Sequence, residues 1–101
     1  MESKLEFIHM GDARVMVPLD MPDNLVEVIL ALAKEAVKTF DVDRAGADAA
    51  KFMKEKLDAS YAPHWHVVVG NSFGSNVVHE SRCFIYFYLG SRAFLVFKMG
   101  Q

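Results

Sequence analysis

The chain has 101 residues, a formal net charge of −2, 52% hydrophobic residues and 24% charged residues. This length suits one domain with a buried core, and the hydrophobic content argues against intrinsic disorder. Because the chain has neither a basic excess nor a Lys/Arg cluster, nucleic acid and anionic membranes are not expected as partners.

Cysteine content and the amino terminus indicate a compartment. Cys83 is the single cysteine, so no disulfide can form within the chain, and a reducing environment is the simpler interpretation. The first four residues, Met1 to Lys4, lack the apolar run of a secretory signal, and no apolar stretch approaches the roughly 20 residues of a membrane span. We therefore expect a soluble, intracellular protein.

The first predicted element is a hairpin. Short apolar runs over residues 5–10 and 14–17 flank Gly11-Asp12, a dipeptide that is typical of tight turns.

A helix is predicted over residues 22–40. Pro22 suits a first helical turn, and Asp23 and Glu27 place negative charge where the helix dipole favours it. Apolar residues recur at helical spacing and define the predicted buried face: Leu25, Val28, Ile29, Leu32, Ala36 and Phe40.

A second helix is predicted from a cap at Asp43 to a point before Pro63, because the residue before a proline disfavours helical geometry. Its predicted inner face comprises Ala49, Phe52, Met53, Lys56 and Leu57, and its outer face Lys51, Lys54 and Glu55.

From His64 onward the side-chain pattern repeats every two residues, as in a β-strand. Five of the eight Phe and the only Trp lie in residues 65–99, in runs separated by 70–74 and Gly90-Ser91. Alternation places Trp65, Val67 and Val69 opposite His66 and Val68, and Phe84, Tyr86 and Tyr88 opposite Ile85, Phe87 and Leu89. With the run at 14–17 counted as the first strand and the run at 5–10 left as an addition to it, the order of one strand, two helices and four strands predicts an α+β domain.

Candidate chemistry is sparse. The four histidines, His9, His64, His66 and His79, together with Glu80 invite a metal or general-base hypothesis. His64 and His66 are two residues apart and would share one face of a strand, but no third ligand has a compelling spacing. Neither Cys83, which opens an apolar strand, nor Ser75, which lacks the second glycine of a nucleophile elbow, has the setting of a nucleophile. We expect no catalysis, no metal and no cofactor.

Tyr86 and Tyr88 alternate on one face of a predicted strand together with Phe84. Two interpretations are comparable from the residues alone: ordinary core with hydroxyls reaching water, or an apolar surface that offers hydroxyls to a partner backbone.

An ordered set of motifs is more specific. Trp65-His66 with Val69-Gly70, Phe73-Gly74-Ser75, His79-Glu80, the run from Phe84 to Gly90, and Phe97-Lys98 with Gly100 follow one another. This set resembles the cytoplasmic dynein light chain family, of the small peptide-binding hub class. The resemblance implies two helices packed on an antiparallel sheet, in a strand-swapped homodimer that binds short disordered segments by β-strand addition. It also divides the chain into a leader or extra strand at 1–13 and the domain at 14–101.

The resemblance also implies particular site residues. A crossing strand is expected at 76–81. The implied peptide-binding groove comprises Phe73, Ser75, Val77, His79, Phe84, Tyr86, Tyr88 and Leu95, with Gly74 near the entry of the crossing strand. The implied dimer interface comprises His66, Asn76, Val78 and Ser81. Expected partners are a second copy and short peptide segments, a dynein intermediate chain among them, in the cytoplasm and in association with the cytoskeleton.

Several positions depart from the family pattern. Ala45-Gly46-Ala47 replaces a Glu-Lys pair that touches the ligand, Val78 replaces a groove threonine, Asn76 a tyrosine and Val17 a lysine. Met99 stands where the family can carry a regulatory serine, so phosphorylation is impossible there. The apolar half of the groove is retained, while preference for Thr-Gln-Thr-like ligands is not implied.

Two alternatives remain open at this point. One is a light-chain-like domain of a calcium-binding tegumental protein of parasitic flatworms, although the chain lacks the Asp-x-Asp-x-Asp-Gly loop of an EF-hand. The other is a metal protein that uses His64, His66 and Glu80.

Overall fold

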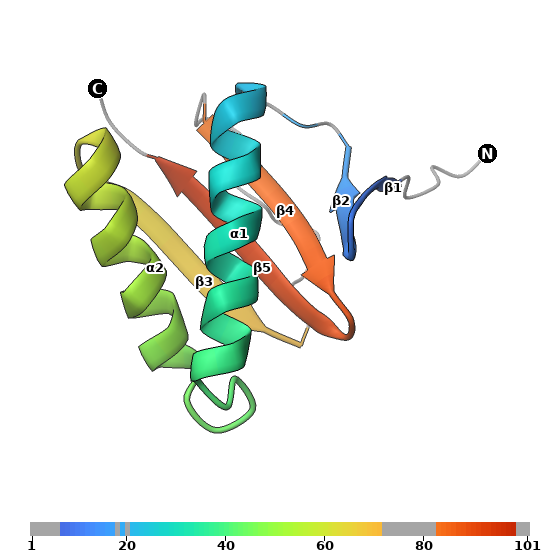
Figure 1. Ribbon diagram of the computed structural model, residues 1–101, viewed down its shortest axis with the longest axis vertical. Coiled ribbons are helices and arrows are strands. Elements are labelled where there is room, and N and C mark those ends of the chain that lie inside the picture. Colours follow the sequence, from blue (N-terminus) through green and yellow to red (C-terminus); the bar gives the residue numbers. More distant parts are fainter. Residues whose placement is uncertain (1–6, 18, 20, 72–82, 99–101) are drawn as a thin grey trace.

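Both helices lie on one face of a five-stranded sheet in the computed structural model (Figure 1). The structure describes residues 7–17, 19, 21–71 and 83–98. Its elements are β1 (Phe7–Met10), β2 (Ala13–Met16), α1 (Asp23–Thr39), α2 (Gly46–Tyr61), β3 (Trp65–Gly70), β4 (Cys83–Leu89) and β5 (Arg92–Lys98). The predicted α+β class is confirmed, and the strand expected at 76–81 lies outside the described residues. Within the described part, no helix has the length and apolarity that a bilayer crossing requires.

The sheet has the strand order β1-β2-β4-β5-β3, and every neighbouring pair is antiparallel. Two-residue connections close both hairpins, because Met10 pairs with Ala13 and Leu89 pairs with Arg92. Gly11 and Gly90 have φ values of +60° and +61°, which a glycine adopts without steric cost. The hairpin predicted around Gly11-Asp12 is therefore confirmed.

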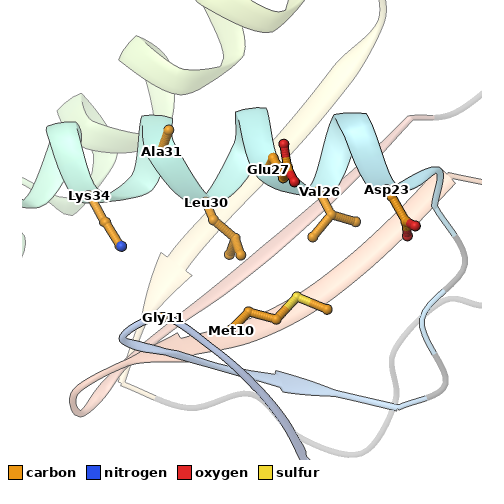
Figure 2. Close-up of a pocket in the computed structure, with 8 residues that line it drawn as sticks. All are labelled: Met10, Gly11, Asp23, Val26, Glu27, Leu30, Ala31 and Lys34. Carbon is orange, nitrogen blue, oxygen red and sulfur yellow. The ribbon is translucent and has the colours of Figure 1, made fainter.

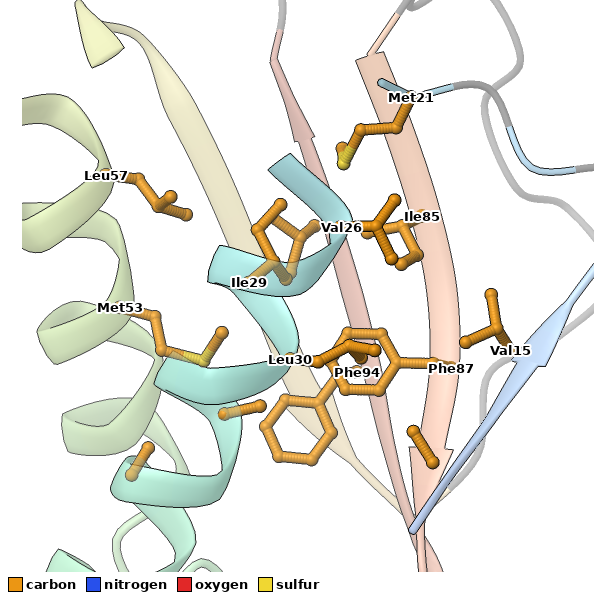
Figure 3. Packing of buried hydrophobic residues seen from close by; sticks show 14 of the residues in the cluster. Val15, Met21, Val26, Ile29, Leu30, Met53, Leu57, Ile85, Phe87 and Phe94 are labelled. Carbon is orange, nitrogen blue, oxygen red and sulfur yellow. The ribbon is translucent and has the colours of Figure 1, made fainter. Parts of the chain in front are cut away.

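The core lies between the helices and the sheet (Figure 3). Strand alternation sends Ile85, Phe87, Phe94 and Val96 toward α1 and α2, and all four side chains are fully buried. The rings of Phe87 and Phe94 stack with their centroids 5.0 Å apart. The alternation predicted for β3 and β4 is thus confirmed.

The predicted face of α1 was only partly right. Its buried residues are Val26, Ile29, Leu30, Ala33 and Ala36, whereas Leu25, Val28, Leu32 and the following Phe40 are half-buried. The reason is that α1 contacts both the sheet and α2. The Phe40 ring lies 5.8 Å from the Phe52 ring of α2, whereas Val26, Ile29 and Leu30 are buried in the core cluster that includes the sheet residues.

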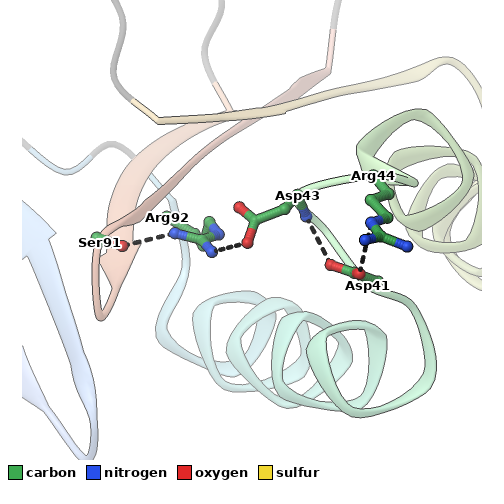
Figure 4. A network of polar contacts seen from close by, with 5 residues as sticks. All are labelled: Asp41, Asp43, Arg44, Ser91 and Arg92. Atoms are coloured by element: carbon green, nitrogen blue, oxygen red, sulfur yellow. Dashed lines mark hydrogen bonds and ion pairs between the residues drawn. The ribbon is translucent and has the colours of Figure 1, made fainter.

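Two expectations for α2 were wrong. The residue that precedes the helix is Ala45, without a side-chain cap, and Asp43 instead forms an ion pair with Arg92 at 2.5 Å (Figure 4). This ion pair connects the loop between the helices to the β4–β5 turn. Lys56 is exposed and does not belong to the inner face of α2. Its long aliphatic side chain lets the ammonium reach solvent, and Nζ lies 5.8 Å from the centre of the Phe52 ring.

Candidate functional site

The face of the sheet that the helices leave uncovered carries a second apolar cluster. Phe84, Tyr86 and Ala93 are its buried members, and Met16, Tyr88, Leu95 and Phe97 pack against them. All of these residues come from β2, β4 and β5 or their ends. We call this surface the open face. It exists because each of these strands places alternate side chains away from the helices.

The centre of the open face is a tyrosine pair. The rings of Tyr86 and Tyr88 stack with their centroids 5.7 Å apart, and their hydroxyl oxygens lie 3.3 Å from each other. Tyr86 of β4 lies directly opposite Leu95 of β5, and Phe84 lies opposite Phe97. Tyr86 is buried, at 8% exposed, and Tyr88 is half-buried, so packing holds the two rings in place and keeps their hydroxyls adjacent.

One edge of the open face is strand β3. Among the described residues β3 pairs with β5 alone, so its outer edge has no strand beside it. His66 is exposed on this strand and stacks on Phe97 at 5.1 Å, and Val68 is 42% exposed. An exposed edge next to exposed apolar side chains is a template for pairing with another strand.

The position of β3 is fixed by Asp58, in the last turns of α2. Its carboxylate accepts hydrogen bonds from the backbone N–H of Trp65 at 2.8 Å and from Lys54 Nζ at 2.5 Å. The Lys54 bond and then the Trp65 bond lower the pKa of Asp58 below its usual value. Because Trp65 starts β3 and is buried against the helices, Asp58 sets where the strand begins and so where His66 lies.

The opposite edge of the open face contains a cation. The Arg14 guanidinium carbon lies 5.0 Å from the centre of the Phe7 ring and 4.9 Å from that of Tyr88. One terminal nitrogen donates a hydrogen bond to the Gly90 carbonyl at 3.1 Å. Strand register explains the arrangement, since Arg14 lies directly opposite Tyr88.

Comparison with known proteins decides the family. The family model described as Dynein light chain type 1 matches residues 13–99. The chain belongs to the dynein light chain family. It is 44% identical over 81 residues to "Dynein light chain 1, cytoplasmic" of Debaryomyces hansenii, a match that covers 80% of this chain and 86% of the relative. It is 47% identical over 79 residues to the Saccharomyces cerevisiae protein of the same name, with 78% and 83% covered.

A solved structure has the same fold. The dynein light chain-like domain of the Fasciola hepatica calcium binding protein FhCaBP2 superposes with a TM-score of 0.77 at 21% identity, over 92% of this chain and 97% of that one. This similarity concerns the fold, so the flatworm alternative has a structural neighbour but no support for a shared role.

The structure describes five of the predicted site residues of this dynein light chain. Phe84, Tyr86, Tyr88 and Leu95 lie together on the open face. His66 lies on the same face, at the β3 edge. The remaining predicted groove residues, Phe73, Ser75, Val77 and His79, and the remaining interface residues, Asn76, Val78 and Ser81, lie outside the described residues.

The sequence analysis did not identify Arg14 and Phe7 as members of this surface. The available signal was the hairpin itself: alternation in two strands joined at Gly11-Asp12 places Phe7 and Arg14 on one face. What the sequence did not contain was the pairing of β2 with β4, which brings both residues to Tyr88.

The metal hypothesis finds no cluster in the described part of the chain, where no three His, Cys, Asp or Glu residues gather around a common point. His64 precedes β3 rather than sharing a strand face with His66, and both are exposed. Glu80 lies outside the described residues.

A hollow of about 570 Å³ separates α1 from the β1–β2 turn (Figure 2). Val26 and Leu30 of α1 point into the hollow toward Met10 on its other side, while Asp23, Glu27 and Lys34 lie along α1. β1 helps to form this hollow and precedes the matched range of the family, which begins at residue 13. Because Val26 and Leu30 are only 3% and 8% exposed, the hollow offers little apolar area to a ligand.

Proposed function

We propose that this dynein light chain is a non-catalytic, dimeric hub that binds short linear segments of partner proteins by β-strand addition. The observation that supports the proposal most is the open face, where Phe84, Tyr86 and Tyr88 lie on the side of the sheet away from α1 and α2. Aromatic rings supply contact area at low entropic cost, and the tyrosine hydroxyls offer hydrogen bonds to a peptide. Strand addition would supply the main-chain bonds.

The proposed dimer completes the sheet at β3. Residues 76–81 of one copy, including Asn76, Val78 and Ser81, would cross to the outer edge of β3 in the other copy. The outer edge of β3, with His66 and Val68 exposed beside it, supports this assignment. A peptide would then extend the sheet along the crossing strand and lie against the open face of the facing sheet in the dimer, where Phe73, Ser75, Val77 and His79 complete the groove.

The ligand preference is proposed to differ from that of light chains that select Thr-Gln-Thr-like segments. α2 begins at Gly46, and the residues around its start, Ala45, Gly46 and Ala47, present no charged side chain. Contact with a ligand there would be limited to backbone groups and methyl groups. Side-chain recognition would therefore depend on the open face.

The proposed cellular setting is the cytoplasm, in association with a dynein motor and with a dynein intermediate chain as a candidate partner. The names of the two yeast relatives, "Dynein light chain 1, cytoplasmic", support this setting. Residues 1–13 remain predicted as a leader or an added strand in front of the domain at 14–101.

Sedimentation equilibrium at micromolar concentration and neutral pH tests the dimer. The wild-type chain should be dimeric, and His66→Lys should shift it toward monomer, because a lysine at the β3 edge would bring a charge into an apolar interface. His64→Lys is the matched control, since His64 is exposed and precedes the strand. A monomeric wild type, or a His66→Lys chain that dimerises like the control, would contradict the dimer.

A peptide array tests the binding function separately. The array should tile the disordered segments of a dynein intermediate chain and include Thr-Gln-Thr peptides. We expect short linear segments to bind the wild type in a stoichiometry of one per chain. A folded, dimeric chain that retains no peptide from the array or from a random library would overturn the proposed function.

A further inference from the structure

Among the residues that the structure describes, the strands of the open face direct one permanently charged side chain away from the helices. None of the residues of the five strands is Asp or Glu, and their Lys and Arg residues are Arg14, Arg92 and Lys98. Arg92 forms an ion pair with Asp43, and Lys98 donates a hydrogen bond to the Tyr61 carbonyl at the end of α2, so both are directed toward the helix side. Among the strand residues, Arg14 is the cation of the open face.

Arg14 is held rigidly but has no anionic partner within the described residues. Two aromatic rings, at 5.0 Å and 4.9 Å, and the bond to the Gly90 carbonyl fix its guanidinium. A guanidinium has five N–H donors, and the structure gives Arg14 a single acceptor. A pre-organised cation with unused donors binds an anion with little further loss of side-chain entropy.

We infer that Arg14 selects an acidic side chain in the peptide that binds to the open face. This inference rests on the proposed function and names the chemistry of its ligand. A carboxylate is the group that fits, because its two oxygens accept the parallel N–H bonds that a guanidinium offers. Arg14 lies opposite Tyr88, whose hydroxyl adjoins that of Tyr86, so the carboxylate would be bound one strand away from the tyrosine pair.

The surrounding residues strengthen this preference. With no Asp or Glu among the residues of the five described strands, an acidic ligand residue would meet no like charge on these strands. A basic ligand residue in the same place would meet Arg14 itself. The two adjoining aromatic rings lower the solvent exposure of the guanidinium, which makes the ion pair stronger than one on a fully hydrated surface.

The experiment uses a random twelve-residue peptide library displayed on phage and selected against the wild type, Arg14→Gln and Arg44→Gln. Arg44 is the matched control, because its side chain is 88% exposed in the loop between the helices. Peptides selected by the wild type and by Arg44→Gln should share an Asp or Glu at one position. Peptides selected by Arg14→Gln should lack that enrichment.

One selected peptide is then synthesised with its acidic residue and with the amide in its place, and both are titrated by fluorescence anisotropy. The amide peptide should bind the wild type at least about 10-fold more weakly, as expected for a charge-assisted hydrogen bond. Arg14→Gln should bind both peptides with equal affinity. Arg14→Lys keeps the positive charge but lacks the paired N–H donors of the guanidinium, so it should retain part of the affinity difference between the two peptides. This variant serves as the test if Arg14→Gln does not fold.

Each contrary result has a distinct meaning. If peptides bind the wild type without acidic enrichment, or if Arg14→Gln keeps the enrichment, the inference about Arg14 is overturned and the hub function stands. If Arg14→Gln alters the sedimentation of the dimer, Arg14 is an interface residue and the inference is also overturned. If the folded wild type selects no peptide, the proposed function itself fails and the inference fails with it.

Discussion

Substitutions at two adjacent residues of β4 should have different effects on peptide binding and on the stability of the fold. Tyr86 lies on the open face and Phe87 lies in the core beneath α1, so Tyr86→Ala and Phe87→Ala perturb opposite sides of one strand. We expect Tyr86→Ala mainly to weaken peptide binding and Phe87→Ala mainly to weaken the fold. The comparison uses two aromatic truncations at neighbouring positions, so backbone propensity is nearly matched.

The magnitudes follow from what surrounds each ring. Phe87 is fully buried and stacks on Phe94 at 5.0 Å, so its removal loses the transfer free energy and leaves a cavity; the cost should be about 3–5 kcal/mol. Tyr86 is also buried, at 8% exposed, within the cluster of the open face. Tyr86→Ala should therefore cost stability as well, at the lower end of the range of about 3–5 kcal/mol that truncation of a buried aromatic residue costs.

Binding should follow the opposite order. Tyr86→Ala removes the central ring and one of two hydroxyls that lie 3.3 Å apart, and should weaken an array-selected peptide by more than about 1 kcal/mol, or at least about 5-fold. Tyr86→Phe isolates the hydroxyl. Phe87→Ala should change the affinity of the folded fraction by less than about 3-fold, since Phe87 contacts the helix side.

The assay combines thermal unfolding at one fixed protein concentration with anisotropy titration at a temperature where every variant is folded. The concentration is fixed because dimerisation would couple Tm to it. Phe87→Ala should lower Tm by roughly 12 °C or more, at about 4 °C or more per kcal/mol for a domain of this size. Equal losses of binding in the two folded variants would refute the assignment of the open face as the binding surface.

Two further predictions concern Asp58 and Gly90. The lowered pKa of Asp58 means that its ionised form stabilises the folded state; this contribution is complete above the unfolded value of 3.8 and is lost as pH falls through the lower folded value. Urea titrations should therefore show Asp58→Asn less stable than wild type at pH 7, with a difference that narrows as pH falls below about 4; a constant difference at all pH values would contradict the role of the charge. Gly90 has φ +61° and open space where a Cβ would lie, so Gly90→Ala should cost about 1 kcal/mol through backbone strain alone, and Gly90→Asn less. Equal Tm values for wild type and Gly90→Ala would show that the turn relaxes.

The sequence by itself determined the local elements and the family. The helix predicted over residues 22–40 is α1, which spans Asp23–Thr39, and the alternation of Trp65, Phe84 and Tyr86 assigned these side chains to their faces of the sheet. These features depend on periods of 3.6 and 2 within a short window, which neighbouring residues alone establish. The order of aromatic and glycine motifs after Trp65 was enough to identify the resemblance that the family match confirms.

Tertiary structure decided the features that depend on distant pairing. The buried stripe of α1 begins at Val26 because α1 contacts both the sheet and α2, and Asp43 pairs with Arg92 instead of capping α2. Arg14 reaches the Gly90 carbonyl across 76 positions of sequence, and only the pairing of β2 with β4 places it against Tyr88. No periodicity specifies which strands become neighbours, because register is set by the burial of whole faces and the closing of long loops. Thus the sequence alone predicted the aromatic residues of the open face, whereas the position of Arg14 beside them depends on the pairing of β2 with β4.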